Sequence, residues 1–202
     1  MKSFAIIPAA GQSTRMGRPK LLLPWNDRTI IEHVLEIWQQ SGVDHRIVVV
    51  SEQGRLAEVC RAAGADVCVP NAPLPEMKDS IEAGLSYARD SFHPTDEDAW
   101  LVAPADMPQL SAGLIRRLIE EYRCSSASVV APRITDGHLG HPVLFPWRLA
   151  AEVPKLTGTL KDLLHSQPIR HVECQKTEVF DDVDTWKDYR RLHNQHDPTD
   201  LI

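Results

Sequence analysis

Short apolar runs alternate with helix-like segments along this chain of 202 residues, and no other feature limits its fold as strongly. Apolar runs typical of strands lie at residues 4–7, 47–50, 99–103, 128–131 and 169–172. Apolar residues recur at helical spacing in residues 29–40, with Thr29 as N-cap, and in 80–88, 111–122 and 184–192. Strands separated by helices favour a mostly parallel sheet covered on both faces. We therefore predict an α/β fold with three layers, α/β/α, in which residues 1–195 form a single domain and residues 196–202 a C-terminal tail.

Charge and hydropathy exclude several classes of partner. Acidic residues outnumber basic ones, 28 to 22, which gives a formal charge of −6 at pH 7. General nucleic-acid binding needs a basic surface, so we expect no nucleic-acid partner. No apolar run approaches the roughly 18 residues that cross a bilayer, and the N-terminus lacks the pattern of a secretory signal. These features predict a cytoplasmic protein with no membrane partner.

Residues 8–20, PAAGQSTRMGRPK, follow the first predicted strand and concentrate cations in this acidic chain. Arg15, Arg18 and Lys20 lie within six residues without an intervening acid, and Gly11 and Gly17 let backbone amides approach a ligand closely. Ligands of parallel sheets bind beyond the carboxyl ends of strands, where this loop would lie. The loop predicts an anion site, most simply for a polyphosphate; the alternative is a surface turn with solvated charges. Its spacing fits neither the Walker loop nor the G-x-G-x-x-G loop.

The same loop resembles the start of the nucleotidyltransferases that process molybdenum cofactor, whose pattern is close to L-A-A-G-x-S-x-R-M-G-x-x-K-x-L-L. Three later segments resemble further motifs of that family in the same order: ADMP at 105–108, GHPVLF at 140–145 and DVDT at 182–185. The resemblance implies a Rossmann-like fold of the nucleotide-diphospho-sugar transferase type. It also implies Mg²⁺-dependent transfer of a nucleoside monophosphate to a phosphorylated acceptor such as molybdopterin, with release of pyrophosphate. A molybdoenzyme is then an expected partner.

The resemblance assigns roles residue by residue. The implied nucleotide-binding residues are Ala9, Ala10, Gly11, Ser13, Arg15, Gly17, Lys20, Asn71 and Ser80. Arg15, Lys20 and Asp106 would be catalytic, and Asp106 and Asp184 would hold Mg²⁺, which prefers one or two carboxylates together with phosphate oxygens. Asp182 is a lesser rival for the metal, and the alternative role for Asp184 is a helix N-cap. The implied acceptor-binding residues are Met77, Gly140, His141, Pro142 and Lys161.

Two segments on the acceptor side depart from the family pattern. NAPLPEMKDS at 71–80 stands where the family carries N-x-x-x-x-G-M-S-S-S, and of the family's G-D-x-G-A-R only the final cation survives, as Lys161. These departures favour a second hypothesis, a non-catalytic accessory protein that delivers cofactor. A guanylyltransferase or a sugar-phosphate nucleotidyltransferase would use the same site, but the methyl of Ala10, where guanylyltransferases tend to carry glycine, favours CTP over GTP. An oxidoreductase is disfavoured because the dinucleotide-binding glycine fingerprint is missing.

Overall fold

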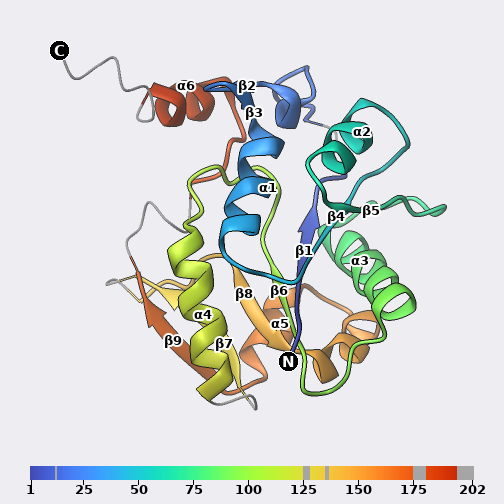
Figure 1. Cartoon of the computed structure of the whole chain (residues 1–202), viewed down its shortest axis with the longest axis vertical. Helices are drawn as coiled ribbons and strands as arrows, with labels where there is room; N and C mark the ends of the chain where they lie inside the picture. Colours follow the sequence, from blue (N-terminus) through green and yellow to red (C-terminus); the bar gives the residue numbers. More distant parts are fainter. Residues whose placement is uncertain (12, 125–127, 135–136, 175–180, 195–202) are drawn as a thin grey trace.

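A single sheet of seven strands organises the chain (Figure 1). The computed structural model describes residues 1–11, 13–124, 128–134, 137–174 and 181–194. The strands are β1 (Ser3–Pro8), β4 (His45–Val49), β5 (Asp66–Cys68), β6 (Ala99–Val102), β7 (Val129–Arg133), β8 (Val143–Pro146) and β9 (Ile169–Glu173). Their order is β5-β4-β1-β6-β8-β7-β9, and β8 runs antiparallel to both neighbours while the other pairs are parallel. The five predicted strands and the mostly parallel sheet are confirmed.

Helices cover both faces of this sheet. They are α1 (Ile30–Gln40), α2 (Arg55–Ala62), α3 (Met77–Phe92), α4 (Ala112–Cys124), α5 (Leu160–His165) and α6 (Trp186–Asn194), with the 3-10 helices η1 (Lys20–Leu22) and η2 (Trp147–Lys155). A small hairpin of β2 (Pro24–Trp25) and β3 (Arg28–Thr29) precedes α1. The predicted helices are present as α1, α3, α4 and α6, and Thr29 caps α1 in a capping box with Glu32. The short elements α2, α5, η2 and β5 were not predicted, because a segment of so few residues spans too few repeats to show a clear helical or strand period.

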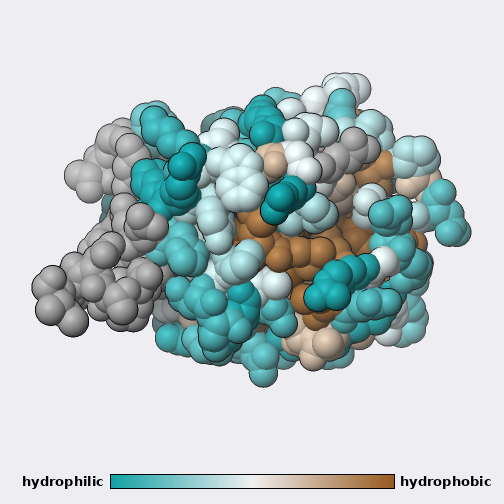
Figure 2. All heavy atoms as spheres, turned by 90° about the horizontal axis from the view of Figure 1, so that it is seen from above, coloured by the Kyte–Doolittle hydropathy of each residue, from teal (hydrophilic) through white to brown (hydrophobic). Residues whose placement is uncertain are grey.

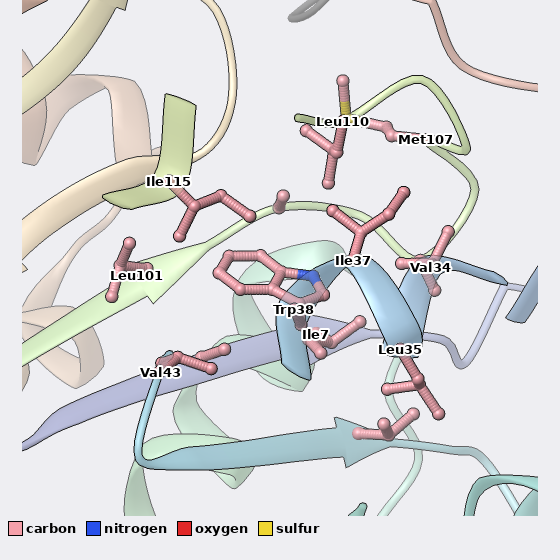
Figure 3. Close-up of a cluster of buried hydrophobic side chains, with 14 of the residues drawn as sticks. Ile7, Val34, Leu35, Ile37, Trp38, Val43, Leu101, Met107, Leu110 and Ile115 are labelled. Atoms are coloured by element: carbon pink, nitrogen blue, oxygen red, sulfur yellow. The ribbon is translucent and has the colours of Figure 1, made fainter. Parts of the chain in front are cut away.

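The strand β1 contributes to two cores, one on each side of the sheet. Side chains alternate along a strand, so Ala5 and Ile7 belong to the core with α1 and α4, whereas Phe4 and Ile6 belong to the core with α3, η2 and α5. All four side chains are fully buried. Figure 3 shows the first core, with Trp38 of α1 lying over the sheet among its apolar neighbours. The predicted three-layer architecture is thus confirmed.

The carboxyl ends of the central strands bring distant segments together. The amide of Ala9, just after β1, donates to the carbonyl of Val49 at 2.8 Å, and the amide of Ala105, after β6, donates to Pro8 at 3.1 Å. The amide of Val183 donates to the carbonyl of Asp106 at 2.9 Å. The loops after β1 and β6 and the segment before α6 therefore meet at one end of the sheet.

The sequence predicts a hairpin or a bent excursion at 134–145, and the chain there turns back into the sheet. Arg133 and Leu139 form an antiparallel bridge, and β8 then inserts between β6 and β7. Residues 135–136 and the predicted tail at 196–202 lie outside the described residues. Within the described part of the chain, no helix is long and apolar enough to cross a membrane.

Candidate active site

A cavity of about 250 Å³ opens at the carboxyl ends of β1 and β6. Figure 2 looks onto this end of the molecule and shows apolar surface bordered by hydrophilic residues. The lining comes from three segments: residues 8–11 with Lys20 and Leu21, residues 74–77 with Ser80, and residues 104–106. The predicted site residues among them are Ala9, Ala10, Gly11, Lys20, Met77, Ser80 and Asp106. An apolar pocket with a few convergent polar groups is typical of small-molecule sites.

Ser13 shapes the loop that carries Lys20 into this cavity. Its backbone has a φ of 51°, and its carbonyl accepts hydrogen bonds from the amides of Met16 at 3.0 Å and Gly17 at 3.2 Å. Its hydroxyl accepts a hydrogen bond from the Lys20 amide at 3.2 Å. Gly17, with a φ of +64°, adopts the left-handed conformation that glycine reaches without strain. Ser13 and Gly17 thus stand behind the cavity rather than among the residues that line it.

Four charged side chains form one network beside the cavity. Lys20 Nζ lies 2.5 Å from Asp106 Oδ2 and 2.9 Å from Asp184 Oδ1, and Arg15 Nη1 lies 2.7 Å from Asp184 Oδ2. Lys20 and Asp106 are 13% and 15% exposed, whereas Asp184 is 40% and Arg15 71% exposed. The fold therefore brings together every residue that the sequence assigns to catalysis or to the metal.

These charges shift one another's protonation. Burial lowers the pKa of Lys20, but the carboxylates of Asp106 and Asp184 outweigh it, and the net pKa is raised. The hydrogen bond from Lys20 is the largest cause of the lowered pKa of Asp184. Asp182 shows the opposite shift: burial and the neighbouring charges of Asp106 and Asp184 raise its pKa. Three carboxylates thus lie close enough to repel one another, and positive charge is needed to offset that repulsion.

The carboxylates of Asp106 and Asp184 suit a hard divalent cation whose remaining coordination positions are filled by a bound ligand and water. Asp106 Oδ1 is buried and has no hydrogen-bond partner among the described residues, so it is an acceptor without a donor. Asp106 and Asp184 both contact Lys20 Nζ, which places the two carboxylates side by side. No group of three or more His, Cys, Asp or Glu residues able to hold a metal is present in the described residues. Two carboxylates with phosphate oxygens and waters would match Mg²⁺.

The helix-cap alternative for Asp184 is wrong. The cap of α6 is the next residue, Thr185, whose hydroxyl accepts a hydrogen bond from the Asp188 amide at 3.2 Å. Asp188 returns the contact by accepting from the Thr185 amide at 2.9 Å, which completes a capping box. Asp184 is therefore left facing Lys20 and Arg15.

The helix α6 also braces the loop after β1, a role that the sequence did not reveal. Trp186 Nε1 donates to the carbonyl of Met16 at 3.2 Å, and Tyr189 Oη donates to the carbonyl of Pro24 at 2.7 Å. The residues of α6 alone gave no signal for either contact.

The predicted acceptor residues other than Met77 do not line the cavity at the ends of β1 and β6. His141 Nδ1 lies 3.4 Å from the carbonyl of Val102, and burial lowers the pKa of His141, with Asp106 opposing this shift and Lys161 adding to it. Gly140 is buried next to it, at the start of the turn into β8. Lys161 lines a separate depression of about 480 Å³, which we call the basic depression; its other charged or titratable residues are Arg133, His138, His165 and His171. Asn71 is exposed and is not among the lining residues of either cavity.

The divergent segment 71–80 uses its charged residues to build the start of α3. The carboxylate of Asp79 accepts a hydrogen bond from the Glu76 amide at 2.9 Å. Lys78 Nζ donates to the carbonyl of Leu156 at 2.8 Å, which ties α3 to the end of η2. Asp79 and Lys78 are therefore engaged with backbone groups, and of the carboxylates in this segment Glu76 is the one that borders the cavity at the ends of β1 and β6.

Sequence reasoning missed one wall of the cavity. Leu74 and Pro75 line it, and on their other side they share a second hollow of about 480 Å³ with Ala10, Gly11, Ser51 and residues 72–73. The available signal was the run of prolines in 70–75, which stiffens a loop between a strand and a helix.

A comparison with protein families decides the relationship. The model of the MobA-like NTP transferase domain matches residues 5–172. This chain belongs to that family. The match includes the loop after β1 and Asp106, and it ends before Asp184.

Proteins similar to this chain carry more than one activity in their names. A molybdenum cofactor guanylyltransferase of Xanthomonas euvesicatoria is 31% identical over 59% of this chain and 56% of its own. A 2-C-methyl-D-erythritol 4-phosphate cytidylyltransferase of Rhodococcus jostii is 34% identical over 62% of this chain and 54% of its own. The matches thus span just over half the length of these two relatives. A nicotine blue oxidoreductase of Paenarthrobacter nicotinovorans is 29% identical over 93% of this chain and 94% of its own.

Solved structures agree on the fold. Rv0371c of Mycobacterium tuberculosis, in a complex with manganese, is 30% identical with a TM-score of 0.74, and the match covers 96% of this chain and 99% of that one. The predicted fold class is therefore confirmed over nearly the whole chain.

Proposed function

We propose that this protein is a Mg²⁺-dependent nucleotidyltransferase that transfers CMP from CTP to a phosphorylated acceptor, with molybdopterin as the leading candidate. One observation carries the proposal: Arg15, Lys20, Asp106 and Asp184 meet in one network beside a cavity at the carboxyl end of β1. This is the charge set that triphosphate binding requires, and it is assembled from three distant parts of the chain. The family match supports the same chemistry.

The reaction exchanges one phosphoanhydride for another. An oxygen of the acceptor phosphate forms a bond to the α-phosphorus, the bond from that phosphorus to the bridging oxygen breaks, and pyrophosphate leaves with the electron pair. Lys20 and Arg15 would hold the phosphates and neutralise the charge that develops on them, and catalysis of this kind comes from alignment and electrostatics. Asp106 and Asp184 would hold Mg²⁺, which when bound neutralises the phosphate oxygens. Each charge-assisted hydrogen bond contributes about 1.5–3 kcal/mol.

The preference for CTP rests on Ala10. Its methyl group borders both hollows beside the loop after β1, where a base would lie. A methyl there narrows the space for a purine, and such a group is worth about 1–3 kcal/mol of discrimination. Ala10→Gly should therefore raise kcat/KM for GTP relative to CTP. An unchanged ratio would remove the reason for preferring CTP, and guanylyl transfer would then be the better proposal.

An anionic acceptor is supported by the basic depression around Lys161. Asp106 and Lys161 both lie close enough to His141 to affect its pKa, in opposite directions, and we therefore infer that an acceptor bound at Lys161 would be near the network. We expect Lys161→Met to raise KM for a phosphorylated pterin while the dissociation constant for CTP stays the same. A matched control is Lys155→Met, which removes a lysine paired with Glu152 outside this depression.

The test of the proposed function is pyrophosphate release with CTP, GTP, ATP and UTP, each with molybdopterin and with sugar phosphates as acceptors. Transfer with CTP and molybdopterin is the expected result. Tight CTP binding without release, with every acceptor, would instead favour the accessory protein that delivers cofactor to a molybdoenzyme.

The likeness to an oxidoreductase over nearly the whole chain favours one further candidate, a redox reaction on the same fold. A redox site has no evident use for two carboxylates held by Lys20 and Arg15, so we rank it second. NADH and NADPH oxidation, followed by absorbance at 340 nm with quinone-like acceptors, separates the two candidates.

A further inference from the structure

Lys20 occupies the space between the two carboxylates that a metal would need. Of the four oxygens of Asp106 and Asp184, Lys20 holds one on each residue and Arg15 holds another, while Asp106 Oδ1 is buried. In the free protein, then, no oxygen of this pair is both accessible and unpaired. A metal ion and the cationic side chains of Lys20 and Arg15 therefore compete for the same carboxylate oxygens.

We propose that Lys20 and Arg15 close the metal site of the free protein, and that the triphosphate opens it by drawing both side chains onto its phosphates. This inference rests on the proposed function for the identity of the anion. The protein's own salt bridges are exchanged for two new sets of contacts: ammonium and guanidinium with phosphate, and divalent cation with carboxylate and phosphate.

The charges require both ligands at once. A divalent cation alone meets carboxylates that are already neutralised, and the described residues supply no group of three or more His, Cys, Asp or Glu residues to hold it. A triphosphate alone removes Lys20 from Asp106 and Asp184 and leaves two adjacent carboxylates without a partner. Only the two together pair every charge, so each should strengthen binding of the other, and couplings of this kind are typically about 5–150-fold.

Lys20 and Arg15 differ in how strongly each blocks the metal site. Lys20 is 13% exposed and contacts both carboxylates, whereas Arg15 is 71% exposed and contacts Asp184 alone. Lys20 should therefore be the main obstacle to the cation and Arg15 a lesser one.

The experiment measures Mn²⁺ binding by electron paramagnetic resonance with no acceptor present, first without nucleotide and then, for the wild type, with CTP. Removal of Lys20 should strengthen metal binding, although it weakens triphosphate binding. We expect Lys20→Met to bind Mn²⁺ about tenfold or more tightly than the wild type, within the usual range of such couplings. Arg15→Gln should give a smaller gain. In the wild type, the spectrum of protein-bound Mn²⁺ should be weak without nucleotide and should grow after CTP is added.

Two controls locate the effect. Lys187→Met removes one positive charge from exposed surface close to Asp184 in sequence, and it should leave Mn²⁺ affinity unchanged. The double change Lys20→Met with Asp106→Asn should lose the gain, because the metal would then have one carboxylate fewer. If Lys20→Met does not fold, as judged by circular dichroism, the Arg15→Gln result decides.

Equal Mn²⁺ affinity in the wild type and in the folded Lys20→Met variant would overturn the inference. An equal gain in Lys187→Met would also overturn it, since the effect would then be general electrostatics. No acceptor or turnover enters these measurements, so a chain that fails to release pyrophosphate can still pass them.

Discussion

Asp106→Asn should separate catalysis from stability. The change keeps the shape of the side chain and removes its charge. In the folded protein the asparagine carbonyl can still accept a hydrogen bond from Lys20 Nζ, which now lies 2.5 Å from Asp106 Oδ2. Lys20 also keeps its contact with Asp184 Oδ1 at 2.9 Å. The variant therefore loses the ionic part of one contact and leaves no ammonium group without a partner.

The two expected magnitudes differ enough to be told apart. A hydrogen bond to a charged group is worth about 1.5–3 kcal/mol and a neutral one about 0.5–1.5 kcal/mol, so the stability cost should be about 1 kcal/mol. For a chain of this size that corresponds to a fall in Tm of about 2–4 °C. Loss of one group that stabilises developing charge typically lowers kcat by about 10²–10³. Catalysis should thus suffer far more than folding.

Pyrophosphate release at saturating CTP and Mg²⁺ gives kcat, and differential scanning calorimetry gives Tm. The matched control is Asp90→Asn, which removes an exposed carboxylate near the end of α3, outside the network. A kcat for Asp106→Asn close to that of the wild type would refute the metal assignment. A large fall in Tm, together with a kcat per folded molecule equal to that of the wild type, would show that Asp106 is a structural residue.

Three further predictions concern other parts of the molecule. Arg15→Gln should weaken CTP binding about tenfold in calorimetric titration, the loss of one charge-assisted hydrogen bond, and should leave Tm unchanged because the side chain is 71% exposed. Gly84→Ala should destabilise the protein by about 1–3 kcal/mol in urea unfolding, since a Cβ would lie 2.8 Å from Ile6 Cγ2. Gly113→Ala, whose Cβ meets nothing closer than 3.5 Å, should not destabilise it. Burial lowers the pKa of His141, so the unfolded chain takes up the imidazole proton at a higher pH than the folded protein does. The free energy of unfolding should therefore decrease as the pH drops below about 6.5. The variant His141→Gln should show a smaller decrease.

Local patterns were enough to predict most of the sheet and the longer helices. The apolar run of β1 and the periodic spacing of α1 and α4 are properties of neighbouring residues, and so is the N-cap at Thr29. The position of the loop after β1 followed from the rule that ligands meet parallel sheets at strand carboxyl ends. The cavity lies at that end.

Features that depend on contacts between distant segments could not be predicted in this way. The insertion of β8 between β6 and β7 is a choice of partner, which the residues of β8 do not specify alone. Likewise, the sequence named Lys20 and Asp184 but not their contact across 164 positions. Leu74 and Pro75 were missed because apolar residues in a loop predict packing as readily as a ligand site.

The segment before α6 supplies Asp184 to the charged network, although the family model ends at residue 172. Asp184 is placed by contacts on both sides. The amide of Val183 donates a hydrogen bond to the backbone carbonyl of Asp106, and Trp186 Nε1 donates one to the carbonyl of Met16 in the loop after β1. Val183 is fully buried in the same core as α1 and α4, so this placement is fixed by packing as well as by hydrogen bonds. A family member that kept the loop and the cavity but lacked a carboxylate at this place would keep the fold and lose the paired carboxylates. One fold can carry transferase and other activities because function depends on the site and not on the fold.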